Sequence, residues 1–151
     1  MKHEELTSNE VEAVNRAEAT FLLIRAGYRV YRPEVDCDGE DLVVRSRDGI
    51  LHPVQQKSRP TVDLKRYGKD NSLWMLFPDP KEAVTLGRKW FLVPHNKLYE
   101  WMQDKHGHTP YWIENEAWHD PTISNELGKF LEDYKVEPVT TDLPSYSSPN
   151  S

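Results

Sequence analysis

Two short strand-like runs on either side of a turn signal constrain the fold of this chain more than any other feature. The first run, "GEDLVVRS", ends at Ser46, and the second, "VQQKSR", begins at Val54. Asp48-Gly49 lies between them, and an Asp-Gly pair is typical of the turn that joins two antiparallel strands. The pattern predicts a pair of strands over 41–46 and 54–58. Since side chains alternate between the two faces of a strand, the length of the connection decides which polar residues share a face.

Three polar residues make that length important. Asp41 opens the first strand, whereas Gln55 and Lys57 stand near the end of the second. A plain two-residue turn would place Gln55 and Lys57 on the face opposite to Asp41. A three-residue loop, or a one-residue bulge near Pro53, would instead pair Asp41 with Gln55. We therefore predict an odd loop or a bulge between Ser46 and Val54.

A long helix is predicted before the hairpin. Thr7 and Glu10 fit a capping box, and Gly27 suits the end of a helix that runs to about Ala26. The carboxylate of Glu18 falls within the apolar arc of this helix. Such a position is uncommon for a carboxylate because burying an unpaired charge is costly. Glu12 points roughly the other way. The arc is formed by Val11, Val14, Ala17, Phe21, Leu22 and Ile24.

The remaining elements are shorter. A strand is predicted over 28–33, a polar loop over 59–72, and two apolar strands over 73–78 and 90–94. Helices are predicted over 96–105 and within 121–135, and the tryptophans are expected to lie in the core of the C-terminal half. This order indicates an α/β (α+β) fold with a mixed central β-sheet flanked by helices.

Length and composition limit the organisation of the chain. The 151 residues fit one domain over 1–137, followed by a Pro-, Ser- and Thr-rich tail over 138–151 that we expect to be disordered. One cysteine, Cys37, excludes a disulfide within the chain. No apolar run is long enough to span a bilayer and no basic-then-apolar leader is present, so we expect a cytoplasmic protein with no membrane partner.

Charge is distributed unevenly along the sequence. The net charge is −6, but residues 45–90 carry ten Lys and Arg against five Asp and Glu. A basic segment of this kind can attract phosphate groups locally, because charges more than about 10 Å away are screened. An ordinary solvated loop would have the same composition, so charge alone leaves both interpretations open.

The order of these motifs resembles the PD-(D/E)XK nuclease superfamily. The resemblance covers about residues 10–60: a helix carrying a Glu, then "GYRV", "DGEDLVV" and "VQQK". It implies a restriction-endonuclease-like core in which Asp41 is the metal-binding aspartate and Lys57 is the lysine of the motif. Glu18 corresponds to the helical glutamate of many members. Gln55 stands where the family prefers an acidic residue, and some branches, including Mrr-like ones, are similar in carrying Q-X-K.

The resemblance implies a Mg²⁺- or Mn²⁺-dependent DNA endonuclease of restriction, defence or repair type. Lys57 would activate the attacking water or stabilise the charge that develops on the phosphate. Many relatives act as dimers, so a homodimer or a partner protein is also expected. The implied metal ligands are Asp41, Glu18, the side chain of Gln55 and the backbone carbonyl of Gln56, and the implied contacts with DNA phosphates are Arg59, Lys65, Arg66 and Lys69.

Two other interpretations remain open. In the first, Gln55 makes the nuclease fold catalytically weak or inactive, and the chain binds nucleic acid or a protein partner without cutting. In the second, the chain is an unrelated α+β domain, such as an inhibitor or immunity-type protein that binds through its acidic surface.

Overall fold

The computed structural model describes residues 5–34, 41–68, 72–82 and 87–139. A five-stranded mixed sheet with the order β1-β2-β3-β5-β6 forms its centre, and a two-stranded sheet pairs β4 with β7. The elements are α1 (Ser8–Arg25), β1 (Arg29–Tyr31), β2 (Leu42–Arg45), β3 (Leu51–Gln56), β4 (Thr61–Asp63), α2 (Leu64–Tyr67), β5 (Trp74–Pro78), β6 (Trp90–Pro94), α3 (His95–His106), α4 (Pro110–Asn115), β7 (Ala117–His119), α5 (Asn125–Leu131) and a 3₁₀ turn η1 (Glu132–Tyr134).

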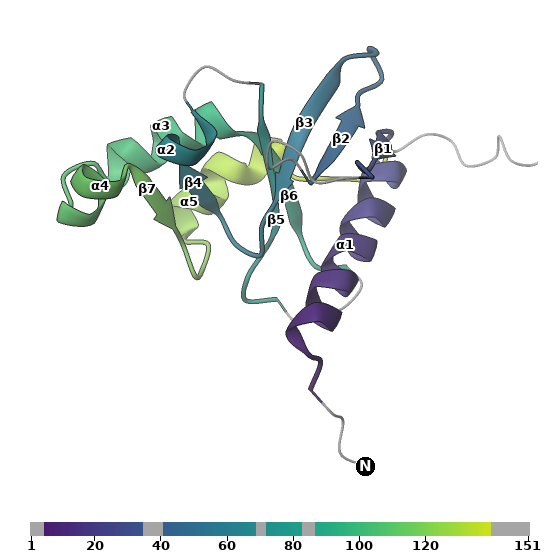
Figure 1. The fold of residues 1–151 in the computed structure, drawn as a ribbon, viewed down its shortest axis with the longest axis horizontal. Helices are drawn as coiled ribbons and strands as arrows, with labels where there is room; N and C mark the ends of the chain where they lie inside the picture. The colour runs from purple at the N-terminus through teal and green to yellow at the C-terminus, as the bar shows by residue number, and fades with distance from the viewer. Residues whose placement is uncertain (1–4, 35–40, 69–71, 83–86, 140–151) are drawn as a thin grey trace, which may run out of the picture.

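The main sheet is antiparallel except at its centre, where β3 runs parallel to β5. Helix α1 lies on one side of the sheet, and helices α2 to α5 lie on the other (Figure 1). The predicted mixed α/β sheet flanked by helices is therefore confirmed. None of the helices within the described ranges is long and apolar enough to cross a lipid bilayer.

Helix α1 begins at the predicted capping box, in which Thr7 Oγ1 accepts from Glu10 N and Glu10 Oε1 accepts from Thr7 N. Its inner face packs on the sheet through Ala19 and Leu23, and these join Leu42, Val44, Val54, Leu76, Trp90, Leu92 and Val136 in one buried cluster. Phe21 and Ile24, which the sequence assigned to the apolar arc, are 54% and 58% exposed. The predicted arc was rotated around the helix from the buried face, because it omitted Ala19 and Leu23, which are buried, and included Phe21 and Ile24, which are not.

A second, larger core lies on the opposite face of the sheet. It joins β5 and β6 to the helical part of the chain through Met75, Phe77, Phe91, Val93, Leu98, Tyr99, Met102, Trp112, Leu127 and Leu131, with Val62 and Leu73. All five tryptophans belong to or pack against one of the two clusters. Trp112 and Trp90 are buried in the two cores, whereas Trp74, Trp101 and Trp118 are partly buried against them, and Trp90 and Trp74 pack on the α1 side.

Residues 59–72 differ from the predicted loop. Thr61–Asp63 forms β4 and Leu64–Tyr67 forms α2, where Asp63 caps the helix by accepting from Arg66 N. β4 pairs with β7, and Leu64 N donates to Glu116 O (3.0 Å). The partners are therefore more than fifty residues away in sequence, so the local composition gave no indication of a strand.

The end of the described chain lies against α1. Val136 N donates to Trp90 O (2.8 Å) at the free edge of β6, and Val139 N donates to Arg25 O (3.0 Å) at the end of α1. The predicted disordered tail therefore begins with two residues, Pro138 and Val139, that the structure describes. The rest of that tail, residues 140–151, lies outside the described ranges, as do Cys37 and Lys69.

Candidate active site

The connection between β2 and β3 has three residues, as predicted. Arg45 pairs with Leu51, and Ser46 N donates to Ile50 O (2.9 Å), which leaves residues 47–49 as the loop. Gly49 has a φ of +86°, in the left-handed region that the last position of a three-residue hairpin loop favours. The register continues to Leu42 opposite Val54.

Asp41 stands directly before the last paired residue of β2, and its side chain reaches Gln55. Its backbone N–H donates to Val54 O (3.0 Å), the carbonyl of the residue that pairs with Leu42. The Asp41 Oδ2 atom accepts from Gln55 Nε2 (2.8 Å) and from the backbone N of Gln56 (2.9 Å). The hairpin thus fixes a half-buried carboxylate on the end of β3.

Two glutamine side chains next to this carboxylate have an oxygen without a partner. Gln55 is 6% exposed and donates to Asp41 through Nε2, while no donor among the described residues reaches its Oε1. The Oε1 atom of Gln56 is likewise buried and unpaired within the described ranges. Since successive residues of a strand face opposite ways, these two oxygens lie on different sides of the sheet. A buried acceptor without a donor costs about 1–3 kcal/mol, so such atoms call for a ligand or a water molecule.

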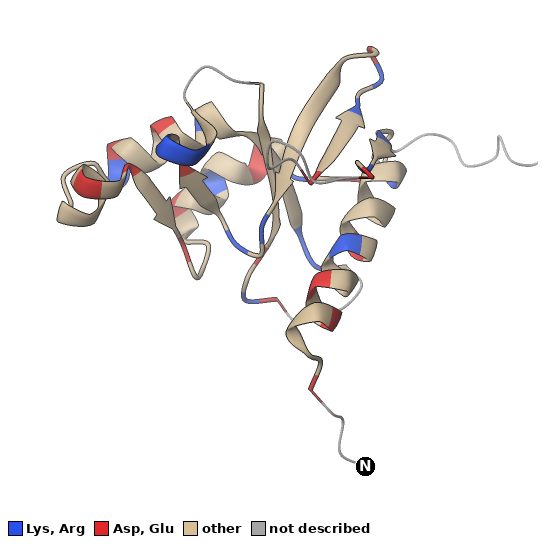
Figure 2. Cartoon of the chain, in the orientation of Figure 1, with Lys and Arg blue, Asp and Glu red and all other residues tan. Residues whose placement is uncertain are grey.

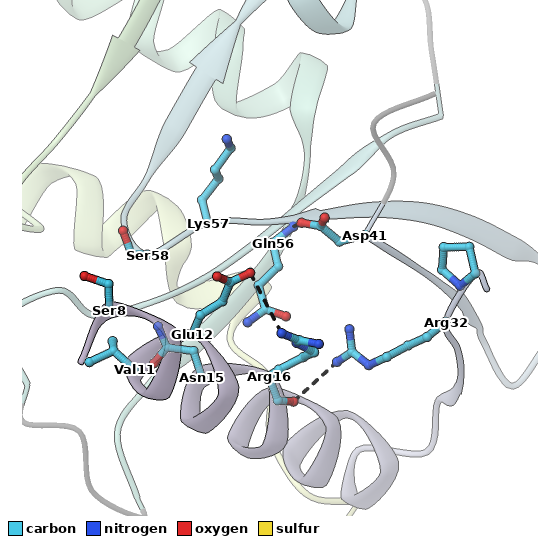
Figure 3. A pocket seen from close by; sticks show the side chains of 11 residues that line it. Ser8, Val11, Glu12, Asn15, Arg16, Arg32, Asp41, Gln56, Lys57 and Ser58 are labelled. Atoms are coloured by element: carbon cyan, nitrogen blue, oxygen red, sulfur yellow. Dashed lines mark hydrogen bonds and ion pairs between the residues drawn. The ribbon is translucent and has the colours of Figure 1, made fainter. Parts of the chain in front are cut away.

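Lys57 follows β3 directly. Its backbone N donates to Leu76 O (2.8 Å) and so extends the parallel pairing with β5. Its half-buried side chain extends away from α1 in Figure 3, and it forms no ion pair with any carboxylate of the described residues. The ammonium group therefore remains available to an anion.

The fold does not bring Glu18 to Asp41 and Lys57. Its Oε1 accepts from Arg88 Nε (2.9 Å) and from Trp90 Nε1, and Arg88 also donates to Asn15 Oδ1. The side chains of Glu18 and Arg88 are each only 5% exposed. The predicted role of Glu18 as a metal ligand is corrected accordingly: its carboxylate is used by a buried ion pair that ties α1 to the start of β6.

Helix α1 presents a different carboxylate, Glu12, to the site. A cavity of about 480 Å³ opens between the first half of α1 and the strand ends, as Figure 3 shows. Helical periodicity predicts that Glu12 points away from the core, and Glu12 does lie outside the core, where it lines this cavity. The lining residues are Ser8, Val11, Glu12, Asn15, Arg16, Arg32, Pro33, Asp41, Gln56, Lys57 and Ser58.

Two arginines that line the cavity, Arg16 and Arg32, were not predicted as site residues from the sequence. Arg32 Nη2 donates to Thr20 Oγ1 (2.7 Å) and to Arg16 O (3.3 Å), which holds Arg32 against α1. Burial, and then the nearby Arg16 charge, lower the pKa of Arg32, while Asp41 opposes the shift. A signal for Arg32 existed in the sequence: β1 and β2 are antiparallel neighbours, so the residues just after β1 meet those just before β2.

The predicted DNA contacts are placed apart from one another. Arg59 is exposed in the segment between β3 and β4, while Lys65 and Arg66 lie on α2. Lys65 Nζ donates to Glu114 O (2.7 Å), and Arg66 lies over the ring of Tyr67. Lys69 is outside the described residues. The cations that line the cavity together with Asp41 are therefore Arg16, Arg32 and Lys57, and none of the described residues of this set does so.

The chain was also compared with known proteins. No protein-family model, no curated protein and no solved structure matches it.

Proposed function

We propose that the chain is a metal-dependent DNA endonuclease with a restriction-endonuclease-like core. The observation that carries the proposal is the contact at the end of the hairpin, where Gln55 Nε2 donates to Asp41 Oδ2 (2.8 Å) and Lys57 follows β3 directly. The helix followed by an antiparallel hairpin, and then by β5 parallel to β3, is compatible with such a core.

The residues next to Asp41 fit a hard divalent cation. Asp41 offers a carboxylate, and Gln55 offers a buried amide oxygen that no described residue engages. The backbone carbonyl of Gln56 would add a third oxygen, and oxygen atoms are the ligands that Mg²⁺ and Mn²⁺ prefer. Within the described ranges no three His, Cys, Asp or Glu side chains cluster, so the set depends on neutral oxygens beside one carboxylate. A bound ion would supply Lewis acidity and a water of lowered pKa.

The charges around the cavity suit a phosphodiester. Arg16, Arg32 and Lys57 line the cavity together with Glu12 and Asp41, so cations exceed carboxylates by one before any metal binds. Lys57, without an ion pair among the described residues, stabilises the negative charge that develops on the phosphate. Arg32, held by α1, positions a non-bridging oxygen or a neighbouring phosphate.

One observation favours a second candidate, a nucleic-acid-binding module that does not cut. The Gln55 amide donates to Asp41, and this bond holds the carboxylate in place without any metal. An acidic residue at position 55 could not do so in its ionised form. Under this alternative the cations of the cavity would bind phosphate, and no hydrolysis would follow.

Cleavage of supercoiled and branched DNA in the presence of Mg²⁺ or Mn²⁺ tests the proposal. Asp41→Asn keeps an oxygen acceptor for the two hydrogen bonds but removes the charge, and we expect it to lower the cleavage rate about 10²- to 10⁴-fold, as Lys57→Ala should. Lys97→Ala, an exposed change on α3, serves as the control. Gln55→Glu adds a charged ligand and should lower the metal concentration needed for half-maximal cleavage.

Three results are informative. Equal cleavage by wild type, Asp41→Asn and Lys57→Ala would show that the activity arises elsewhere and would reject the site. DNA binding without cleavage by wild type, together with cleavage gained by Gln55→Glu, would support the second candidate. Thermal unfolding of each variant checks that lost activity is not lost folding.

A further inference from the structure

One half of the main sheet has a face that no helix covers within the described residues. Leu42, Val44 and Val54 point toward α1, so the alternate residues of β2 and β3 point the other way. The core on that other side takes its sheet residues from β5 and β6 and contains none from β1, β2 or β3. Figure 1 shows the β2–β3 hairpin standing clear of helices α2 to α5. We call this surface the open face, defined by Arg29, Tyr31, Val43, Arg45, Leu51 and Pro53.

Two arginines lie directly opposite each other on the open face. Arg29 pairs with Arg45 across β1 and β2, and both side chains are exposed. Like charges in directly opposed positions destabilise a sheet. Neither arginine forms an ion pair with a carboxylate of the described residues. Figure 2 shows both a basic and an acidic segment at the hairpin turn, where Arg47 is followed by Asp48. Two exposed cations side by side, without a carboxylate partner among the described residues, attract anions to this position.

The open face leads from the arginine pair to the candidate active site. Tyr31 lies opposite Val43, and Val43 lies opposite Pro53, one step along the sheet from Arg45 and Leu51 on the same face. Tyr31 and Leu51 are 47% and 58% exposed. Gln55 is the next residue of β3 on this face, and its Nε2 donates to Asp41 Oδ2 (2.8 Å), which also lines the cavity beside α1. Four residues separate Arg45 from Asp41, which at the rise of a β-strand is about 13 Å.

We propose that the open face is a nucleic-acid-binding platform on which the arginine pair, Arg29 and Arg45, binds the sugar–phosphate backbone about 13 Å from Asp41. Phosphates of one strand recur about every 3.4 Å along a duplex axis, so this contact lies about four base pairs from the phosphate at Asp41 when the duplex follows the strands. Tyr31 contacts the backbone sugars between the two points. The proposal rests on the proposed function for the position of the cut, but the platform binds nucleic acid whether or not cutting follows.

The test is the affinity for a fluorescent 20-base-pair duplex in EDTA, measured by anisotropy over a range of salt concentrations. Arg29→Ala/Arg45→Ala removes the pair, and the matched control Lys97→Ala/Lys129→Ala removes two exposed charges from α3 and α5. We expect the arginine double variant to bind about 10- to 100-fold more weakly at low salt, and its slope of log K against log salt to fall in magnitude by about 2. The control should keep the wild-type slope. Removing two opposed cations should leave the melting temperature equal or higher, so misfolding is separable from lost binding.

The outcomes separate this inference from the nuclease proposal. Equal affinity and slope for the arginine double variant and the control would overturn the platform, whether or not the wild type cleaves DNA. Weaker binding by the arginine double variant alone supports the platform, and if the wild type then fails to cleave with Mg²⁺ or Mn²⁺, only the nuclease proposal is lost. A wild type that binds no nucleic acid overturns both.

Discussion

Removing the carboxylate of Glu18 should destabilise the protein strongly. Glu18 and Arg88 are each 5% exposed, and Glu18 Oε1 accepts from Arg88 Nε at 2.9 Å and from the indole N–H of Trp90. In Glu18→Ala the Arg88 guanidinium keeps only the Asn15 side chain as a polar partner among these groups. Breaking a buried ion pair by removing one partner costs about 3–5 kcal/mol, because the other charge stays buried. For a chain of this length that corresponds to a fall in melting temperature of roughly 10–20 °C.

Urea unfolding followed by circular dichroism measures this free energy directly. Glu12→Ala is the matched control on the same helix. The Glu12 side chain is 73% exposed and its Oε1 lies 3.8 Å from Arg16 Nη2. The free energy of unfolding should therefore change by less than about 0.5 kcal/mol. Replacing both partners, in Glu18→Leu/Arg88→Met, leaves no unpaired charge and should recover most of the loss. A cost below about 1 kcal/mol for Glu18→Ala would refute the buried pair.

Two further predictions concern the cores. His95 is fully buried and its Nε2 accepts from Asp63 N (3.0 Å), and burial lowers the pKa of this imidazole to about 4. On acidification, His95 therefore becomes protonated near pH 6.5 in the unfolded chain but only near pH 4 in the folded chain. Between these two pH values the free energy of unfolding falls by about 3 kcal/mol. In His95→Gln this fall in the free energy of unfolding should be absent when urea unfolding is measured at several pH values. A variant whose free energy of unfolding depends on pH as strongly as that of the wild type would contradict the prediction. On α1, Leu23→Ala should cost about 2–5 kcal/mol and the exposed Phe21→Ala about 0.5 or less, so the reverse order in thermal unfolding would contradict the assigned core face.

The hairpin could be read from the sequence because its determinants are local. The Asp-Gly pair, the two apolar runs and the need to bury Val54 together limit the register, since a shift of one residue would expose every buried side chain. Pro53 did not need a bulge. It lies within β3 opposite Val43, and the pairing with β5 begins only at Val54, so the missing N–H of Pro53 deprives no neighbouring strand of a donor.

The elements that were missed depend on distant partners. Thr61–Asp63 has no apolar run, and it is a strand because Ala117–His119 lies beside it. Arg88, the partner of Glu18, follows it by seventy residues. A carboxylate on an apolar helix face was correctly recognised as unusual, but periodicity cannot distinguish a buried ion pair from a metal ligand. Both satisfy the same requirement, that a buried charge has a partner.

The residue at position 55 is placed by the register of the hairpin and acts through its contact with Asp41. The register places this side chain against Asp41 whatever residue stands there, so the choice of residue determines the charge of the site and not its geometry. Two carboxylates at this separation would repel each other unless a cation lay between them, because a like charge within about 4–6 Å disfavours ionisation. Glutamine removes that requirement: Nε2 binds Asp41, while Oε1 remains unpaired among the described residues. The hydrogen bond between Gln55 and Asp41 therefore forms without a metal, and we expect the proposed cleavage to require a higher concentration of Mg²⁺ than a site with two carboxylates would.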